Sequence, residues 1–352
     1  MSILKTQKRI RDFNIPIGNM STGKNNSITD VEGVKVGHVT LNNNKIKTGI
    51  TVVLPHTGNI FRKKVVGACH VINGFGKSTG LLQIEELGNI ETPIILTNTL
   101  SVGAAHEGLV NFMLSIDENI KSINPIICEC NDSYLNDIRE LHVKDYHVFE
   151  AIKNASSSFE EGNVGAGTGM VCYELKGGVG TSSRVVSIDN EIYTVGVLVL
   201  SNFGDMEDLI INGNFVGKNL KNIIKPEDER EEEGSIILIV ATDIPLSSRQ
   251  LKRVIKRVEP GIARTGGFIG HNSGEIAIGF STANIINHFE ENTILNMKII
   301  NEANINKVFK AVSEATEEAI LNSLICSNTT KGKDGHIVYS LKDYVNELLP
   351  LD

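Results

Sequence analysis

Short apolar segments that suit buried β-strands recur along the chain. They lie at residues 34–38, 50–54, 93–97, 125–129, 193–201 and 235–241. The segment from Tyr193 to Ser201 is apolar on both faces of a strand, so its sheet is expected to be covered on both sides. Apolar residues at helical spacing predict helices at 104–114, 135–152, 247–257 and 305–325. This alternation predicts α/β layers with sheets between helices, and no linker divides the 352 residues into separate domains.

Glycines are unevenly distributed between these segments. Many of the 33 glycines gather at 74–80, 162–169, 177–180 and 261–274. Glycine is used where the backbone takes a positive φ or approaches another group closely. Four such clusters predict a functional site that is built largely from backbone.

Composition and charge exclude several classes of protein. With 41% hydrophobic and 22% charged residues and a net charge of −8, the chain fits a soluble globular protein that does not bind nucleic acid. The densest charged run, 225–233, is mostly acidic and is expected to be a solvated loop. No apolar stretch approaches the roughly 20 residues that span a bilayer, and residues 1–9 lack the apolar core of a secretory signal. No membrane association is expected.

The five cysteines indicate reduced thiols and a cytoplasmic location, because an odd number suits no disulfide framework. Cys128 and Cys130 alternate around Glu129, so both thiols are expected on one buried face of a strand. No cysteine or histidine spacing typical of a metal site occurs.

No cofactor is expected either. Gly76-Lys77-Ser78 lacks the earlier glycine of a phosphate-binding loop, because position 71 is valine. The glycines at 165, 167 and 169 lack the spacing of a dinucleotide-binding turn. Ser273 is not in the G-x-S-x-G turn of a serine hydrolase, and His271 lies too close in sequence to pair with it without strain.

The strongest chemical signal is a glycine-rich turn that leads into a strand starting at Ser273. In such a turn a serine hydroxyl can attack the preceding carbonyl, here that of Asn272, and the resulting ester is then cleaved by water. The product has a free α-amine on the nucleophile itself, with an ordinary pKa of ~7.7–8.0. Such an amine can act as the general base for its own hydroxyl.

A series of segments in the same order resembles the DmpA family of L-aminopeptidases with D-amidase or D-esterase activity and β-aminopeptidases. The segments are 28–40, 91–103, 131–137, 165–170, 176–184, Asn202-Phe-Gly204, 241–246, 270–275 and 314–320. The resemblance implies a single domain over residues 1–352 with a four-layer αββα sandwich, similar to N-terminal-nucleophile hydrolases but differently connected. It also implies autocleavage between Asn272 and Ser273 into chains 1–272 and 273–352, and a homo-oligomer, specifically a tetramer.

The family motifs assign roles to individual residues. Ser273 matches the nucleophile, Asn202 an amide lining the oxyanion hole, and Tyr134 an active-site tyrosine. Thr316 and an acid after it match a pair that holds the nucleophile's amine and hydroxyl. The spacing favours Glu318, whereas a helical wheel places Glu317 beside Thr316 and Glu318 on nearly the opposite side. Glu318 is preferred because a layered sandwich can bury both sides of this helix.

The resemblance implies that the protein removes N-terminal residues from small peptides, aminoacyl amides or esters through an ester on Ser273. The substrate ammonium then requires a carboxylate, for which Glu129 and Asp132 are the candidates. Lys77 stands where some relatives have an acid, so substrate preference does not transfer directly. The alternatives are an acyltransferase of the ornithine acetyltransferase type, which has a threonine nucleophile where Ser273 stands here, and a catalytically inactive relative.

Overall fold

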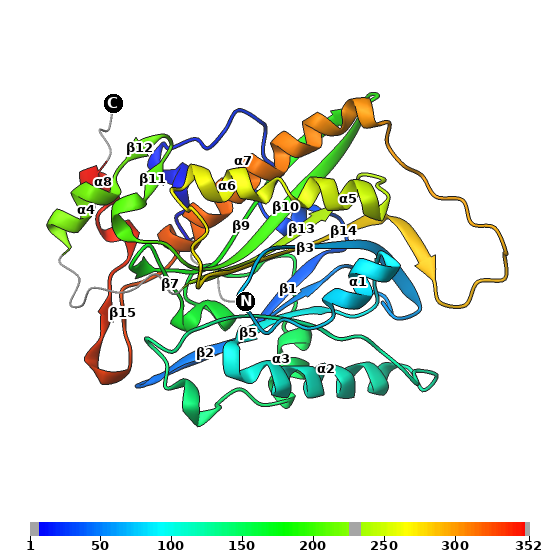
Figure 1. The fold of residues 1–352 in the computed structure, drawn as a ribbon, viewed down its shortest axis with the longest axis horizontal. Helices are drawn as coiled ribbons and strands as arrows, with labels where there is room; N and C mark the ends of the chain where they lie inside the picture. Colours follow the sequence, from blue (N-terminus) through cyan, green and yellow to red (C-terminus); the bar gives the residue numbers. More distant parts are fainter. Residues whose placement is uncertain (1–6, 225–233, 349–352) are drawn as a thin grey trace.

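The computed structural model describes residues 7–224 and 234–348, in which two β-sheets lie face to face between two helical layers (Figure 1). The acidic run 225–233 and residues 1–6 lie outside the described residues. One sheet has the strand order β1-β2-β5-β6 and the other the order β4-β3-β14-β13-β10-β9. The strands of the first are β1 (Lys35–Asn43), β2 (Ile46–Leu54), β5 (Ile94–Asn98) and β6 (Ile126–Cys130). Those of the second are β3 (Lys63–Gly74), β4 (Asn89–Ile90), β9 (Gly178–Ile188), β10 (Glu191–Asn202), β13 (Ser235–Thr242) and β14 (Gly274–Asn287).

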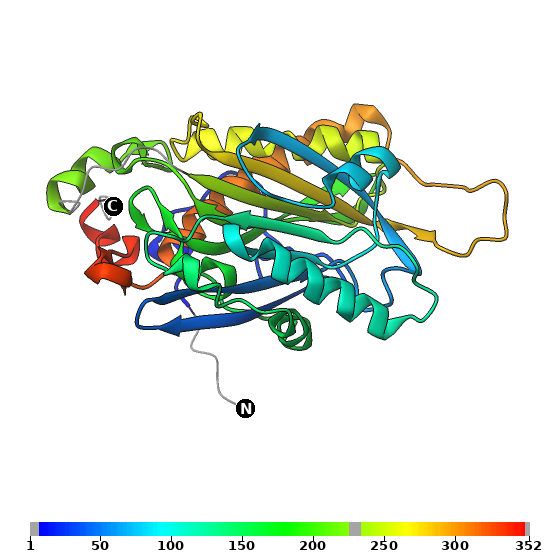
Figure 2. The ribbon, with the colours of Figure 1, turned by 60° about the horizontal axis from the view of Figure 1, so that its bottom comes forward.

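Helices cover the outer face of each sheet, which confirms the predicted αββα sandwich. The four-stranded sheet is covered by α2 (Val102–Ile116) and α3 (Tyr146–Lys153), and the six-stranded sheet by α5 (Ser248–Ile255), α6 (Val258–Arg264) and α7 (Ile305–Ile325). The remaining elements are α1 (Leu81–Leu87), α4 (Gly217–Ile223), α8 (Val345–Leu348) and the short strands β7 (Val171–Cys172), β8 (Leu175–Lys176), β11 (Ile210–Ile211), β12 (Asn214–Phe215), β15 (Thr330–Lys331) and β16 (Ile337–Val338). The connection from β14 to α7 projects beyond the layers in both views (Figures 1 and 2).

Alternation along β10 divides the interior into two cores. Val197 and Val199 pack with residues of α5, α6 and α7, whereas Leu198 and Leu200 pack with the four-stranded sheet. Successive side chains of a strand point to opposite faces, so a strand that is apolar at every position is buried on both. The prediction of a sheet covered on both sides is thereby confirmed.

Most predicted elements occur, but the helix predicted at 135–152 is wrong. A 3-10 turn at Ile138–Glu140 ends at Leu141, whose φ of 50° lies in the left-handed region, and α3 begins only at Tyr146. Strand β9 was not predicted, because its inward side chains are polar: Ser182 Oγ donates to the carbonyl of Ala315 in α7 (2.6 Å), and Arg184 is fully buried. Cys128 and Cys130 are buried in β6 as predicted.

The sheets place the ends of several strands together. Asn202 at the end of β10 pairs with Ser235 at the start of β13, and Ser235 pairs with Gly274 at the start of β14. The other sheet joins them at the same end, since the Cys130 thiol at the end of β6 donates to the carbonyl of Leu200 (3.5 Å). Within the described ranges, no helix has the length and apolar character needed to cross a membrane.

Candidate active site

A cavity of about 650 Å³ opens where these strand ends meet. It receives residues from both sheets and from the β15–β16 hairpin near the C-terminal end of the chain. Its lining consists of Phe75, Lys77, Thr99, Glu129, Asn131, Ser133, Tyr134, Val171, Asn202, Gly234, Ser235, Asn272, Lys333, Asp334 and His336. Four residues that the sequence assigns to the site or the cleavage point are thus brought to one cavity, namely Glu129, Tyr134, Asn202 and Asn272.

The Asn272–Ser273 bond lies in a tight turn at the cavity wall. The Ser273 N–H donates to the carbonyl of Gly270 (3.2 Å), and the Asn73 side-chain amide donates to the carbonyls of Gly270 (3.0 Å), His271 (3.1 Å) and Ser273. The Ser273 side chain is buried, and its Oγ has no hydrogen-bond partner in the described part of the chain. The hydroxyl is therefore not held away from the neighbouring carbonyl by another acceptor or donor.

The backbone leading to this turn is strained. Ile269 has a φ of 64°, and a β-branched residue in this region costs about 1–3 kcal/mol. At Gly266 the φ is 101°, and a Cβ atom there would lie 1.8 Å from the carbonyl oxygen of Asp208. The glycine cluster at 261–274 thus serves a close backbone approach, as the sequence predicts.

Asn202 has one amide atom fixed by the backbone and the other available to the cavity. The Val171 N–H donates to Asn202 Oδ1 (2.9 Å). This bond fixes the orientation of the side-chain amide, because its NH2 group could not accept a hydrogen bond in place of Oδ1. The side chain is buried and lines the cavity. Its Nδ2 donors are therefore directed to the other side of the amide, away from Val171.

Tyr134 lies half-buried in the cavity wall, with its ring stacked on that of His336 (centroids 4.4 Å apart, planes tilted by 33°). His336 follows the loop that contains Lys333 and Asp334, and the Lys333 N–H donates to the carbonyl of Leu135 (2.9 Å). The hairpin is therefore attached to the segment of Tyr134. Sequence reasoning missed Lys333, Asp334 and His336, because their motif-free loop gives no signal.

Of the two predicted ligands for a substrate ammonium, the structure brings only Glu129 to the cavity. Glu129 is buried at the end of β6, where its Oε1 accepts from the Lys77 N–H (2.9 Å) and its Oε2 from the Thr99 hydroxyl. No lysine, arginine or histidine forms an ion pair with it among residues 7–224 and 234–348. Asp132 is fully buried outside the lining, where Asn136 Nδ2 donates to its Oδ1 (3.0 Å).

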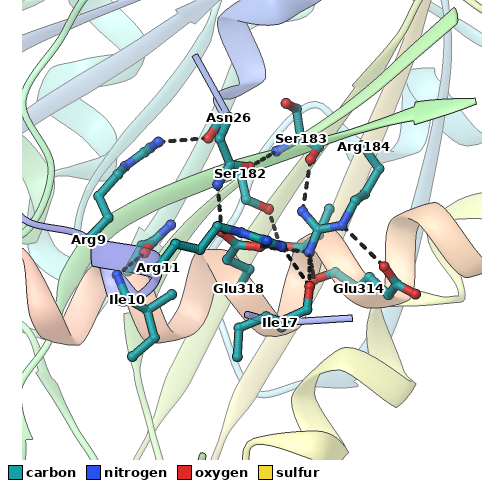
Figure 3. A network of polar contacts seen from close by, with 12 residues as sticks. Arg9, Ile10, Arg11, Ile17, Asn26, Ser182, Ser183, Arg184, Glu314 and Glu318 are labelled. Carbon is teal, nitrogen blue, oxygen red and sulfur yellow. Dashed lines mark hydrogen bonds and ion pairs between the residues drawn. The ribbon is translucent and has the colours of Figure 1, made fainter. Parts of the chain in front are cut away.

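The structure does not bring the predicted acid Glu318 into the cavity either. Both oxygens of its buried carboxylate bind arginines: Arg11 at 2.7 Å and Arg184 at 2.7 Å (Figure 3). Burial opposes its ionisation, but these two guanidinium groups hold the pKa of Glu318 below its ordinary value. The side of α7 opposite Thr316 is buried because the N-terminal segment, including Ile10 and Ile17, packs on it.

Thr316 and Glu317 lie on other faces of α7 and are also absent from the lining. Thr316 packs on α6 at Gly261, and its buried Oγ1 has no hydrogen-bond partner among the described residues. Glu317 lies 3.5 Å from Arg264, and burial raises its pKa. The position of Glu318 is thus set by its bonds to Arg11 and Arg184. Neither arginine was predicted as a site residue, although Arg184 belongs to the matched segment 176–184.

Comparisons with known proteins agree with this arrangement. The model of peptidase family S58 matches residues 26–338. The beta-peptidyl aminopeptidase BapA of Sphingosinicella microcystinivorans is 37% identical over 355 residues, covering 95% of this chain and 89% of the relative.

Solved structures give the same assignment. The PH0078 protein of Pyrococcus horikoshii OT3 is 51% identical with a TM-score of 0.93, covering 97% of this chain and 98% of the other. The L-aminopeptidase D-Ala-esterase/amidase of Ochrobactrum anthropi is 35% identical with a TM-score of 0.88, covering 95% of each chain. It is described as a prototype for the serine aminopeptidases and a new variant of the Ntn hydrolase fold. The chain therefore belongs to peptidase family S58, which confirms the sequence-based prediction of a serine aminopeptidase.

Proposed function

We propose that this aminopeptidase cleaves its own chain between Asn272 and Ser273, and that Ser273 then removes N-terminal residues from small peptides, amides or esters. The observation that carries the proposal is the position of this bond. It borders a cavity that also contains the amide of Asn202 and the carboxylate of Glu129, and the buried Ser273 hydroxyl is not engaged by any described residue.

Self-cleavage proceeds by an N→O acyl shift. Ser273 Oγ attacks the carbonyl carbon of Asn272, the C–N bond breaks, and the hydroxyl proton passes to the departing nitrogen. Water then hydrolyses the ester, which leaves a carboxylate on Asn272 and a free amine and hydroxyl on Ser273. The strain at Ile269 and the bonds from Asn73 hold the turn in its bent form, which favours attack.

In the cleaved enzyme the Ser273 amine takes the proton of its own hydroxyl as Oγ attacks the substrate carbonyl. Asn202 Nδ2 donates to the oxyanion, and the Tyr134 hydroxyl is a second candidate donor from the cavity wall. The Ser273 ammonium returns the proton to the leaving amine, and water cleaves the acyl-enzyme. Thr316, whose hydroxyl is unengaged by the described residues, is proposed to hold the Ser273 amine after cleavage. Glu318 acts on the site through the position of α7.

Glu129 is proposed to bind the substrate ammonium, which would supply the cation that this buried carboxylate lacks in the described structure. The names of relatives include both L-aminopeptidase and beta-aminopeptidase, so the released residue is an α- or a β-amino acid. A cytoplasmic location is supported by the five cysteines, all of which are buried and free. The tetramer rests on the family resemblance, and light scattering would measure it.

Product analysis tests the function. Wild-type protein is incubated with a dipeptide and with an aminoacyl amide, with and without an added amine acceptor. Release of the free N-terminal amino acid, and its loss in Ser273→Ala, is the expected result. A product in which the acyl group appears mainly on the acceptor amine would instead identify an acyltransferase.

A further inference from the structure

Lys176 is a fully buried lysine whose three ammonium donors are all used by backbone carbonyls. It lies at the end of β8, and its Nζ donates to the carbonyls of Met170 (2.6 Å), Gly177 (2.7 Å) and Gly167 (3.0 Å). A buried ammonium is costly, so such a residue is expected to have a use that an apolar side chain could not supply.

The carbonyl of Met170 belongs to the peptide unit whose N–H is that of Val171. Lys176 Nζ donates to one end of this unit at 2.6 Å, and the other end donates to Asn202 Oδ1 at 2.9 Å. A continuous hydrogen-bonded chain thus runs from the Lys176 ammonium through one peptide group to the amide of Asn202. Each bond in such a chain polarises the next, by about 10–30% in condensed phases.

We infer that Lys176 is a positioning residue for the reaction, which fixes the Met170–Val171 peptide and thereby orients and polarises the Asn202 amide toward the oxyanion. The inference rests on the proposed role of Asn202. A positive charge at the far end of the chain withdraws electron density from the Asn202 amide, so its Nδ2–H groups become stronger donors. The effect is largest in the transition state, where the oxyanion carries most charge.

Three backbone carbonyls accept from the Lys176 ammonium and favour its charged form, whereas burial favours the neutral form. Burial lowers the pKa of Lys176 to about 7, and this decrease is opposed by Cys172 and then by Asp132 when these groups are ionised. The Cys172 thiol, the other titratable group close to the ammonium, has a pKa raised by burial to about 12 and stays neutral. Asp132, predicted as a substrate ligand, is a fully buried acid near Lys176, and burial raises its pKa to about 6.

A double-mutant cycle tests the inference with kcat measured on the cleaved protein. Lys176→Met is expected to lower kcat on the order of 10-fold with little change in KM, while Asn202→Ala lowers kcat by itself. In the Asn202→Ala background, Lys176→Met should lower kcat by less than about twofold, because its effect passes through Asn202. An equal loss in both backgrounds would mean that Lys176 acts only through general stability and would overturn the inference.

Lys47→Met is the matched control, since Lys47 is also buried and its Nζ also donates to a backbone carbonyl, that of Asn44 (2.8 Å), but it has no bond to the Asn202 chain. It is expected to leave kcat unchanged. If Lys176→Met does not fold, Lys176→Gln keeps a donor for the Met170 carbonyl, and the same cycle applies to it. A normal kcat in Asn202→Ala would refute the oxyanion assignment, whereas a large loss there without coupling refutes only the role of Lys176.

Discussion

Replacement of Glu129 by glutamine removes the proposed charge for the substrate ammonium and preserves the shape of the side chain. In wild type, Oε1 accepts from the Lys77 N–H and Oε2 from the Thr99 hydroxyl. Glutamine keeps an oxygen for the Lys77 N–H, and the Thr99 hydroxyl can rotate to accept from the new amide. The fold should therefore persist, and the change isolates the charge.

The expected loss follows from the burial of this carboxylate. A hydrogen bond to a charged group contributes about 1.5–3 kcal/mol, which corresponds to a decrease of about 10- to 150-fold in kcat/KM. The assay is release of anilide from an alanyl or β-alanyl anilide. Inhibition by an amino-acid amide should weaken by a similar factor, while inhibition by the same amide without its amino group should not change.

Asp334→Asn is the control, because Asp334 is another acid of the cavity lining but is exposed on the β15–β16 hairpin. Exposed charges contribute little, so its kcat/KM should stay within about threefold of wild type. If Glu129→Gln is folded and fully cleaved but retains kcat/KM within about twofold of wild type, Glu129 does not bind the ammonium.

Substitutions at three further residues test other parts of the site. Asn202→Ala should lower kcat by about 10²–10³-fold. Asn202→Asp keeps an acceptor for the Val171 N–H, so it should lose about as much activity as Asn202→Ala but less stability. A melting temperature below that of Asn202→Ala would contradict this. Asn73→Ala removes the bonds that hold the turn and should slow self-cleavage, as followed by gel densitometry; an unchanged rate would exclude this role. Glu318→Gln should lower the free energy of unfolding by about 3–5 kcal/mol in urea titrations, because Arg184 loses a buried partner, and an unchanged midpoint would contradict it. Folding lowers the pKa of Glu318, so its ionised carboxylate stabilises the fold at pH values above its ordinary pKa. This stabilisation is lost as the pH falls through the pKa of the folded state. The Glu318→Gln variant should therefore lose less stability than wild type on acidification.

The sequence predicts elements well where one local signal dominates. Helix α7 has the predicted bounds, 305–325, because apolar periodicity extends over several turns. Strand β9 escapes prediction, because its buried polar residues are satisfied by partners that are distant in sequence, such as Ala315 for Ser182. The local periodicity of apolar and polar residues does not predict such long-range hydrogen bonds.

Site residues are likewise predictable where the signal is local in the sequence. Ser273, Asn202, Tyr134 and Glu129 lie at strand ends or in turns whose neighbouring segments match a family, and the structure places them in or beside one cavity. The position of Glu318 depends on Arg11, which is 307 residues away and arrives with the N-terminal segment. No sequence pattern around residue 318 predicts that contact.

The central claim is that self-cleavage gives Ser273 a free N-terminus. A mass measurement on purified wild-type protein tests this most directly. Denaturing mass spectrometry is expected to show two chains, residues 1–272 and 273–352, and the smaller should begin Ser-Gly-Glu-Ile. Ser273→Ala should give one intact, inactive chain, because the attacking oxygen is missing. A wild-type preparation that hydrolyses aminoacyl anilides while its mass remains that of the single 38.3 kDa chain would contradict the account.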